Sequence, residues 1–363
     1  MTKRKTKKVS QNNTVSEKTA SAATKPSATN KRLSKTLYIL LLFPLFLALM
    51  IGGILLNYNL IVKNPEISVV MPVYNTAKYL PESISGVLDQ TFKDFELIMV
   101  NDGSTDNSLE IMQEYAKKDK RIKVVNMDKN SGAAAARNEG IKYITGEYTL
   151  FVDSDDFMLP VMLEKMYNQA KLYNLDIVMS LAWAVDEPSG DLFPISIIDR
   201  KVSFAYHFLQ KQHINYFSYK QFPKIFFQLM RKYVWDKLIK TSVIKDNNLY
   251  FDNVQSHNDS YFITMALLHA KRIGYITDRV YLYRANRSGS VSGKNPDDMK
   301  SSYDTFIKIR QSLQDMGIYN ELYESFMKWV GSFIPPEDWP LQTQEDYIYR
   351  QKLIELRYNS DDI

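Results

Sequence analysis

Short apolar, strand-forming segments alternate with amphipathic, helix-forming segments from residue 67 to residue 179. Alternation of this kind predicts parallel strands joined by right-handed helical crossovers. We therefore expect an α/β fold in which helices cover a mostly parallel central sheet. The predicted strands are Ile67–Met71, Phe95–Val100, Ile122–Asn126, Tyr148–Val152 and Asp176–Met179. The predicted helices are Pro81–Asp89, Leu109–Ala116, Ala133–Tyr143 and Pro160–Tyr173.

Outside residues 67–179 the sequence no longer alternates regularly between strand-forming and helix-forming segments. Beyond residue 180 the periodicity is poor, although a helix over Ser260–Ala270, two short strands over 272–276 and 280–283, and a helical C-terminal extension are predicted. The predicted segments are a disordered basic tail (1–35), a transmembrane anchor (36–57), a linker (58–65), a first half of the globular part (66–180), its second half (181–300) and the C-terminal extension (301–363).

The net charge of +5 is misleading because the basic residues are concentrated in the tail. The first 35 residues hold ten Lys or Arg and one Glu, a charge of +9, which leaves about −4 for the remainder. A nucleic-acid-binding domain typically shows a basic surface, so we expect no nucleic acid as partner. The chain has no cysteine, which excludes disulfides, thiolate metal sites and cysteine nucleophiles.

The anchor prediction rests on residues Leu37–Leu56, which carry no charge. About twenty such residues in a helix span the hydrocarbon core of a bilayer. The basic residues before them favour a cytosolic amino terminus, and hence a single-pass type II protein. In a eukaryote the rest of the chain would then face the Golgi or ER lumen. In a bacterium the chain would lie at the inner membrane, with the part after the anchor separated from the cytosol unless the anchor inserts the other way.

Three carboxylates follow the strand Tyr148–Val152, in the sequence Asp153-Ser154-Asp155-Asp156. The carboxyl edge of an open α/β sheet is where such folds bind ligands. Carboxylates so close together repel one another unless a cation or several donors hold them, which makes a divalent metal a candidate. The alternative is a strand followed by an ordinary helix cap, and the cluster alone does not decide between them.

Three further segments carry polar groups at predicted strand ends. In Met71-Pro72-Val73-Tyr74-Asn75 the ring of Tyr74 could stack on a base, and main-chain groups could bind the base edge. In Asn101-Asp102-Gly103-Ser104-Thr105-Asp106, Asp102 could accept a hydrogen bond from an imide N–H, and Asp106 could cap the next helix. In Asn130-Ser131-Gly132 and the small-residue helix that follows, Arg137 needs a partner if it is buried, either a nucleotide or Asp153. The alternatives are an ordinary strand end, a plain cap and an exposed arginine.

Together, these four segments resemble the inverting glycosyltransferases of family 2, which have the Rossmann-like GT-A fold of nucleotide-diphospho-sugar transferases. The resemblance covers about residues 66–180. It implies a nucleotide-diphosphate sugar donor, usually a uridine one, whose base contacts Pro72, Val73, Tyr74 and Asp102. It also implies that Arg137, Asp153 and Ser154 contact the donor, with Asp153 toward the ribose. Asp155, with Asp153 as a second candidate, would bind Mn²⁺ or Mg²⁺ at the diphosphate.

The resemblance also implies a general base at the start of a helix beyond the sheet. We assign this role to Asp259 in Ser256-His257-Asn258-Asp259, although Asn258 differs from the commoner Glu and Asp259 could be only a helix cap. His257 is a weaker candidate. Trp235 and Lys237 resemble residues expected on the acceptor side, and Arg284 and Arg287 could neutralise the diphosphate, although ordinary solvated arginines would look the same.

The preferred hypothesis is therefore a membrane-anchored, metal-dependent glycosyltransferase that acts on a glycan or glycolipid acceptor. A nucleotidyltransferase of similar fold is one alternative, but it should have a Gly-rich loop with Lys or Arg after the first strand. A processive synthase should have further membrane spans and a Gln-x-x-Arg-Trp motif, and the sequence has neither. A catalytically inactive glycan-binding derivative is the third alternative, and it would not need Asp153, Asp155 and Asp259 together.

Overall fold

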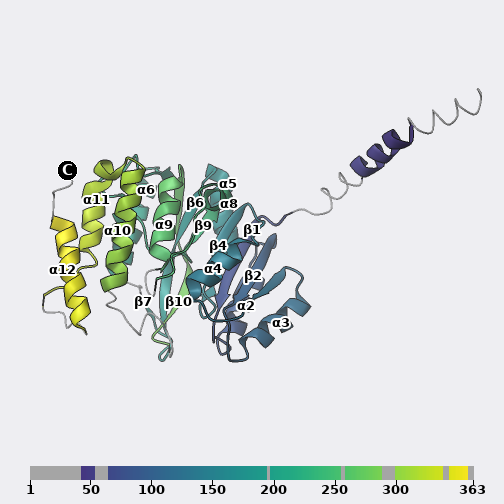
Figure 1. Ribbon diagram of the computed structural model, residues 1–363, viewed down its shortest axis with the longest axis horizontal. Helices are drawn as coiled ribbons and strands as arrows, with labels where there is room; N and C mark the ends of the chain where they lie inside the picture. Colours follow the sequence, from purple (N-terminus) through teal and green to yellow (C-terminus); the bar gives the residue numbers. More distant parts are fainter. Residues whose placement is uncertain are drawn as a thin grey trace, which may run out of the picture. The chain divides into compact units, whose positions relative to one another are not determined.

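The computed structural model of the 363-residue chain describes residues 42–53, 64–193, 197–254, 258–287, 299–337 and 343–358. These residues belong to two compact units, Met1–Lys63 and Asn64–Ile363. In the first unit, residues 42–53 form a helix whose side chains are nearly all exposed. The second unit contains every element named below, and Figure 1 labels most of them.

Across the described ranges, no helix combines the length and the apolarity that crossing a bilayer requires. The predicted anchor, 36–57, extends past the described helix at both ends. The predicted tail, 1–35, and most of the predicted linker, 58–65, also lie outside the described residues. The anchor therefore stays a prediction.

The second unit is built around one sheet, whose strands lie in the order β3-β2-β1-β4-β9-β6-β10-β5. The strands are β1 (Ile67–Val73), β2 (Phe95–Asn101), β3 (Ile122–Asn126), β4 (Tyr148–Phe151), β5 (Phe157–Met158), β6 (Ile177–Asp186), β7 (Leu192–Phe193), β8 (Tyr216–Phe217), β9 (Lys237–Lys240) and β10 (Ile273–Ala285). The helices are α2 (Leu80–Leu88), α3 (Ser108–Lys118), α4 (Ala133–Ile141), α5 (Met162–Tyr173), α6 (Ile197–Lys211), α7 (Phe226–Leu229), α8 (Thr241–Asp246), α9 (Asn258–His269), α10 (Met299–Asp315), α11 (Tyr319–Gly331) and α12 (Gln344–Tyr358).

The first half of the sheet confirms the predicted parallel arrangement. Strand β1 pairs in parallel with β2 on one side and with β4 on the other, and β2 pairs in parallel with β3. Pro72 is compatible with its central strand because β1 pairs with β4 only from Ile67↔Tyr148 to Val70↔Phe151. Beyond that point the missing N–H of proline breaks no ladder hydrogen bond.

The prediction of a mostly parallel sheet holds only in part for the second half, where β10 pairs in parallel with β6 but other pairings are antiparallel. Strand β9 lies between β4 and β6 and is antiparallel to both. No strand is predicted for its four residues, because a run as short as Leu238-Ile239 carries no clear periodicity. The sheet is therefore mixed, and the predicted boundary at residue 180 falls inside β6. The two predicted strands near 272–283 are one strand, β10, with register shifts between Tyr275 and Tyr281.

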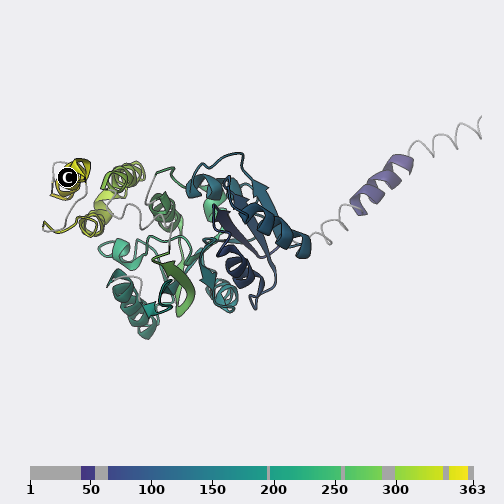
Figure 2. The same cartoon turned by 90° about the horizontal axis from the view of Figure 1, so that it is seen from below.

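Both faces of the sheet are covered, because alternate residues of each strand point to opposite sides. Val70 packs in a core with residues of α4, α6 and α9 to α12. Val69 and Met71 pack in a second core with residues of α2, α3 and α5. Helices α10, α11 and α12 lie side by side at one end of this unit, which confirms the predicted helical extension (Figures 1 and 2).

A buried charged cluster fixes the start of β9. The side chains of Arg231, Asp236 and Lys237 are at most 2% exposed. Asp236 accepts hydrogen bonds from Arg231 Nε at 2.6 Å and from Lys237 Nζ at 2.5 Å, and Arg231 also donates to Ser180 O at 2.7 Å. Removing one member of such a cluster leaves an uncompensated buried charge, so these residues hold β9 against β6.

Close packing of α4 on the sheet depends on Gly140. A Cβ at this position would lie 2.5 Å from Cγ1 of Val70, a buried and rotationally stiff side chain. We predict that Gly140→Ala lowers the free energy of unfolding by about 1–3 kcal/mol through overpacking. Urea denaturation measures this change. Alanine is a better helix former than glycine, so without overpacking the substitution would raise the free energy of unfolding. A measured increase would therefore contradict the packing argument.

Candidate active site

The loop after β4 carries the three predicted carboxylates at the carboxyl edge of the sheet. The Asp153 side chain is 26% exposed and that of Asp155 is 15% exposed, whereas Asp156 is buried. Ser154 is also buried, and its Oγ accepts a hydrogen bond from Thr76 Oγ1 at 3.0 Å. Asp153 and Asp155 therefore face the edge of the sheet, whereas Ser154 and Asp156 face the interior of the protein.

Asp156 is the internal support of this loop. Its carboxylate accepts hydrogen bonds from the Tyr281 hydroxyl at 2.9 Å and from the Arg284 backbone N–H at 2.7 Å. The Tyr281 hydroxyl also accepts from the backbone N–H of Asp153 at 3.2 Å. Burial, followed by the charges of Asp155 and Asp153, raises the pKa of Asp156 well above its ordinary value. Strand β10 therefore supports this loop through Tyr281 and Arg284, and Asp156 is the loop residue that receives both hydrogen bonds.

Arg137 joins the acidic loop to the start of α9. This arginine is 6% exposed, and its guanidinium donates to Asp153 Oδ1 at 2.6 Å and to Asn258 Oδ1 at 3.2 Å. Its guanidinium also lies 5.4 Å from the centre of the Phe251 ring. Arg137 is therefore buried rather than exposed, and of the two partners expected for it, a nucleotide or Asp153, the structure shows Asp153. The contact of Arg137 with a donor stays a prediction.

Asp155 is paired with Arg287, which follows the end of β10. The Nε of Arg287 contacts Asp155 Oδ2. Burial and the neighbouring charge of Asp153 raise the pKa of Asp155, and Arg287 opposes this effect. Arg284 is bound elsewhere, since it donates to the Asp155 carbonyl at 2.9 Å and to Glu82 at 2.6 Å.

The loop after β2 is held by backbone N–H groups of the loop after β3. Asp102 is buried, and its two carboxylate oxygens accept the backbone N–H groups of Ser131 at 2.7 Å and Gly132 at 2.8 Å. Each carboxylate oxygen has a second lone pair, so a contact with a base edge stays a prediction. The Tyr74 ring is 43% exposed and able to stack on a ligand, whereas Pro72 and Val73 are buried.

Asp259 lies in the first turn of α9, next to the Arg137 bridge. Burial raises the pKa of Asp259 above its ordinary value of 3.8, the charges of Arg137 and Lys232 lower it, and Asp153 raises it further. Asp153 and Asp259 are therefore close enough to interact, although they are 106 positions apart in the sequence. His257 and Ser256 lie outside the described residues.

Trp235 and Lys237 have structural roles, which corrects their predicted position on the acceptor side. Lys237 is fully buried, and its ammonium donates to Asp236 and to the carbonyls of Arg231 and Tyr233 at 2.8 and 2.7 Å. These bonds use all three ammonium protons. Trp235 is 3% exposed and stacks on Tyr281 with ring centres 4.5 Å apart. It therefore braces the tyrosine that supports Asp156.

The donor set fits a divalent cation only if the ligand supplies further oxygens. Among the described residues, no group of three or more His, Asp or Glu side chains could hold a metal by itself. Mg²⁺ is commonly held by one or two carboxylates together with substrate phosphates. Asp155, with Asp153 beside it, matches that pattern at the sheet edge, provided that the contact with Arg287 is broken.

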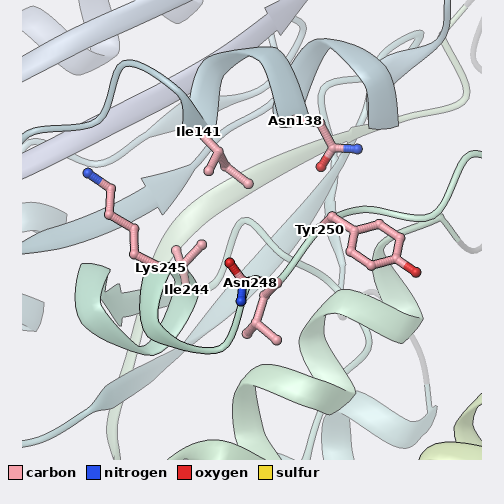
Figure 3. Close-up of a pocket in the computed structure, with 7 residues that line it drawn as sticks. Asn138, Ile141, Ile244, Lys245, Asn248 and Tyr250 are labelled. Carbon is pink, nitrogen blue, oxygen red and sulfur yellow. The ribbon is translucent and has the colours of Figure 1, made fainter.

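Figure 3 shows a separate pocket of about 450 Å³. It is lined by Asn138, Ile141, Ile244, Lys245, Asn248, Leu249 and Tyr250. The predicted site residues do not line it. Asn138 borders it while its amide exchanges two hydrogen bonds of 2.8 Å with the Phe251 backbone. These bonds hold the 247–254 segment close to Arg137.

Several contributors were not identified from the sequence. Tyr281 supports the acidic loop, Asn258 receives Arg137, and Lys232 acts on Asp259. A buried tyrosine in a strand signals that its hydroxyl needs a partner, so Tyr281 could have been identified. Lys232 carries no such signal, because only the tertiary fold brings it near α9.

Comparisons with known proteins agree with this geometry. Residues 68–236 match Glycosyl transferase family 2. Glycosyltransferase GlyG of Streptococcus pneumoniae is 35% identical over 229 residues, covering 62% of this chain and 72% of GlyG. The cholesterol galactosyltransferase of Borreliella burgdorferi is 32% identical over 318 residues, covering 82% of this chain and 83% of that protein.

A solved structure shows the same fold. The S. aureus TarS 1–349 structure in complex with UDP-GlcNAc has a TM-score of 0.61 and 24% identity, and it covers 80% of this chain and 81% of that chain. At this level of identity the likeness shows only the GT-A-like fold. Combined with the two sequence relatives, it identifies the chain as a glycosyltransferase that belongs to glycosyltransferase family 2.

Proposed function

We propose that this enzyme transfers a sugar, with inversion, from a nucleotide-diphosphate sugar to a hydroxyl of a glycan or glycolipid acceptor. The observation that carries the proposal is the Arg137 bridge, which holds the acidic loop and the first turn of α9 together. Inversion requires a base and a departing diphosphate on opposite sides of one carbon. Of two acidic elements held side by side, one can bind the diphosphate through a metal and the other can supply the base. The family assignment favours this reaction over the nucleotidyltransferase alternative.

The donor is proposed to be a UDP-sugar. Tyr74 offers an exposed ring for a base, and Asp102 offers carboxylate lone pairs for an imide N–H. Asp153, partly exposed and oriented by Arg137, is available to the ribose. The TarS structure in complex with UDP-GlcNAc supports this choice of nucleotide.

A divalent cation, Mn²⁺ or Mg²⁺, would be held by Asp155, with Asp153 nearby, and would neutralise negative charge on the departing diphosphate. A fold relative, the mannosyltransferase PcManGT of Pyrobaculum calidifontis, was solved with GDP-Man and Mn²⁺ at a TM-score of 0.50 and 14% identity, which supports a metal. The buried Asp156 keeps the loop in shape because both of its oxygens are already bonded.

Asp259 is proposed as the general base that removes the proton from the acceptor hydroxyl. Burial raises its pKa, which makes its carboxylate a stronger base at neutral pH than an exposed aspartate. Arg137 and Lys232 keep it ionised enough to accept a proton. Because Asp153, Asp155 and Asp259 are all present, an inactive glycan-binding derivative is the weaker hypothesis.

The acceptor and the location of the enzyme are also proposals. Relatives include a cholesterol galactosyltransferase and the poly(ribitol-phosphate) beta-N-acetylglucosaminyltransferase TarS, of which 36% is covered by this chain. A lipid-linked or polymeric hydroxyl acceptor is consistent with both names. The uncharged run Leu37–Leu56 supports attachment to a membrane, in a type II orientation if the positive-inside rule holds.

Asp259→Asn tests the base. We expect the transfer rate to fall by roughly 10²–10⁴-fold while UDP affinity is unchanged, because the amide cannot accept the proton and the donor contacts remain. Transfer assays and calorimetric titration with UDP measure the two effects. Asp278→Asn, an exposed aspartate paired with Lys165, is the matched control and should be fully active. Loss of UDP binding in Asp259→Asn would instead make Asp259 a structural residue.

The pH profile offers a second test of the same residue. A base must be deprotonated to act, so the rate should fall as pH decreases through the raised pKa of Asp259. We therefore expect the acidic limb of kcat/KM above pH 3.8, the ordinary pKa of an aspartate. An acidic limb at or below that value would show that the carboxylate is not perturbed as the structure requires.

Removal of the metal tests Asp155. Treatment with EDTA should abolish transfer, and Mn²⁺ or Mg²⁺ should restore it. Asp155→Asn should lower kcat/KM by roughly 10²–10³-fold, since charge on the departing diphosphate loses its stabilisation. Asp304→Asn, at an exposed pair with Lys300, is the control. Full activity in EDTA would reject the metal-dependent reaction.

A further inference from the structure

Asp155, the carboxylate assigned to the metal, is paired with a positively charged side chain. Arg287 contacts its Oδ2 through Nε, and the two side chains are only 14% and 15% exposed. An ion pair this sheltered is weakly screened by solvent, so it is stronger than an exposed surface pair. Any cation that binds Asp155 must therefore compete with Arg287.

The two neighbouring arginines of this segment are not equivalent. The Arg284 guanidinium is held by Glu82 and by the Asp155 carbonyl. Its backbone N–H binds Asp156 as well. Both arginines lie over the Tyr79 ring, at 4.9 Å for Arg284 and 5.8 Å for Arg287. Arg284 is therefore part of the scaffold, whereas Arg287 is the arginine whose side chain contacts the carboxylate of the proposed metal ligand.

The backbone before Arg287 is fixed, so an exchange of partners requires only a side-chain movement. Asn286 adopts a left-handed conformation, with φ of +58°, at the end of β10. Its amide donates to Asp186 Oδ1 at 2.7 Å. This left-handed turn fixes the backbone before Arg287 and directs the arginine toward the acidic loop.

We propose that Arg287 acts as a resident cation that occupies Asp155 in the donor-free enzyme and moves to the diphosphate when donor and metal bind together. This inference rests on the proposed function, because it takes Asp155 as the metal ligand. A guanidinium and a divalent ion on the same carboxylate repel each other, so metal binding without donor is opposed. A diphosphate offers Arg287 a new anionic partner, suited to its fork of donors, and releases Asp155.

The consequence is positive coupling between metal and nucleotide. Each should bind more tightly in the presence of the other, by the same factor. The empty enzyme then binds little divalent metal, and the site assembles only around a complete donor.

Binding of Mn²⁺ to the full-length protein, measured by EPR or calorimetry with and without UDP, tests this proposal without using activity. Arg287→Gln should bind Mn²⁺ at least about tenfold more tightly than wild type when UDP is absent, and should gain less affinity when UDP is added. Arg287→Lys keeps the positive charge and should stay close to wild type. Arg121→Gln, which breaks a remote pair with Asp119, is the matched control and should also match wild type.

The results distinguish failure of the competition by Arg287 from failure of the proposed metal site at Asp155. If Asp155→Asn weakens Mn²⁺ binding and Arg287→Gln does not strengthen it, the competition by Arg287 is rejected while the metal site stands. If Asp155→Asn binds Mn²⁺ as tightly as wild type in the presence of UDP, Asp155 is not the metal ligand and the proposed function itself is wrong at this point.

Discussion

The buried guanidinium of Arg137 is the contact on which the arrangement of this site depends. A buried charge is costly unless it is paired, and Arg137 is paired with Asp153 from the loop after β4 and with Asn258 at the start of α9. These two partners come from segments that are far apart in the sequence. One charge therefore fixes the distance between the proposed donor-binding loop and the proposed base, Asp259.

The remaining charges are distributed so that each carboxylate has a different environment. Asp156 is buried and held by Tyr281 and the Arg284 backbone, so it shapes the loop. Asp155 is held by a side chain, that of Arg287, whose partner can change. Differences of this kind allow adjacent identical residues to serve separate roles, because environment decides which form each carboxylate adopts. The stack of Trp235 on Tyr281 connects this division to the buried cluster around Asp236.

Local pattern predicted the parallel half of the fold well, because strands such as β1 are nearly continuous apolar runs and helices such as α2 carry an apolar face. It could not predict β9, whose four residues are antiparallel only because of their tertiary neighbours. The same limit applies to the site. Asp102, Arg137 and the acidic loop follow from strand ends and burial, whereas the acceptor-side role of Lys237 was wrong because its buried partners are not visible in the sequence.

A crystal structure with Mn²⁺ and a non-transferable UDP-sugar analogue tests the central claim most directly. The account predicts Mn²⁺ at about 2.1 Å from an Asp155 oxygen, with Arg137 still bridging Asp153 and Asn258. It also predicts Asp259 on the side of the anomeric carbon opposite the diphosphate. A metal bound away from Asp155, or an Asp259 carboxylate on the same side as the diphosphate, would contradict it.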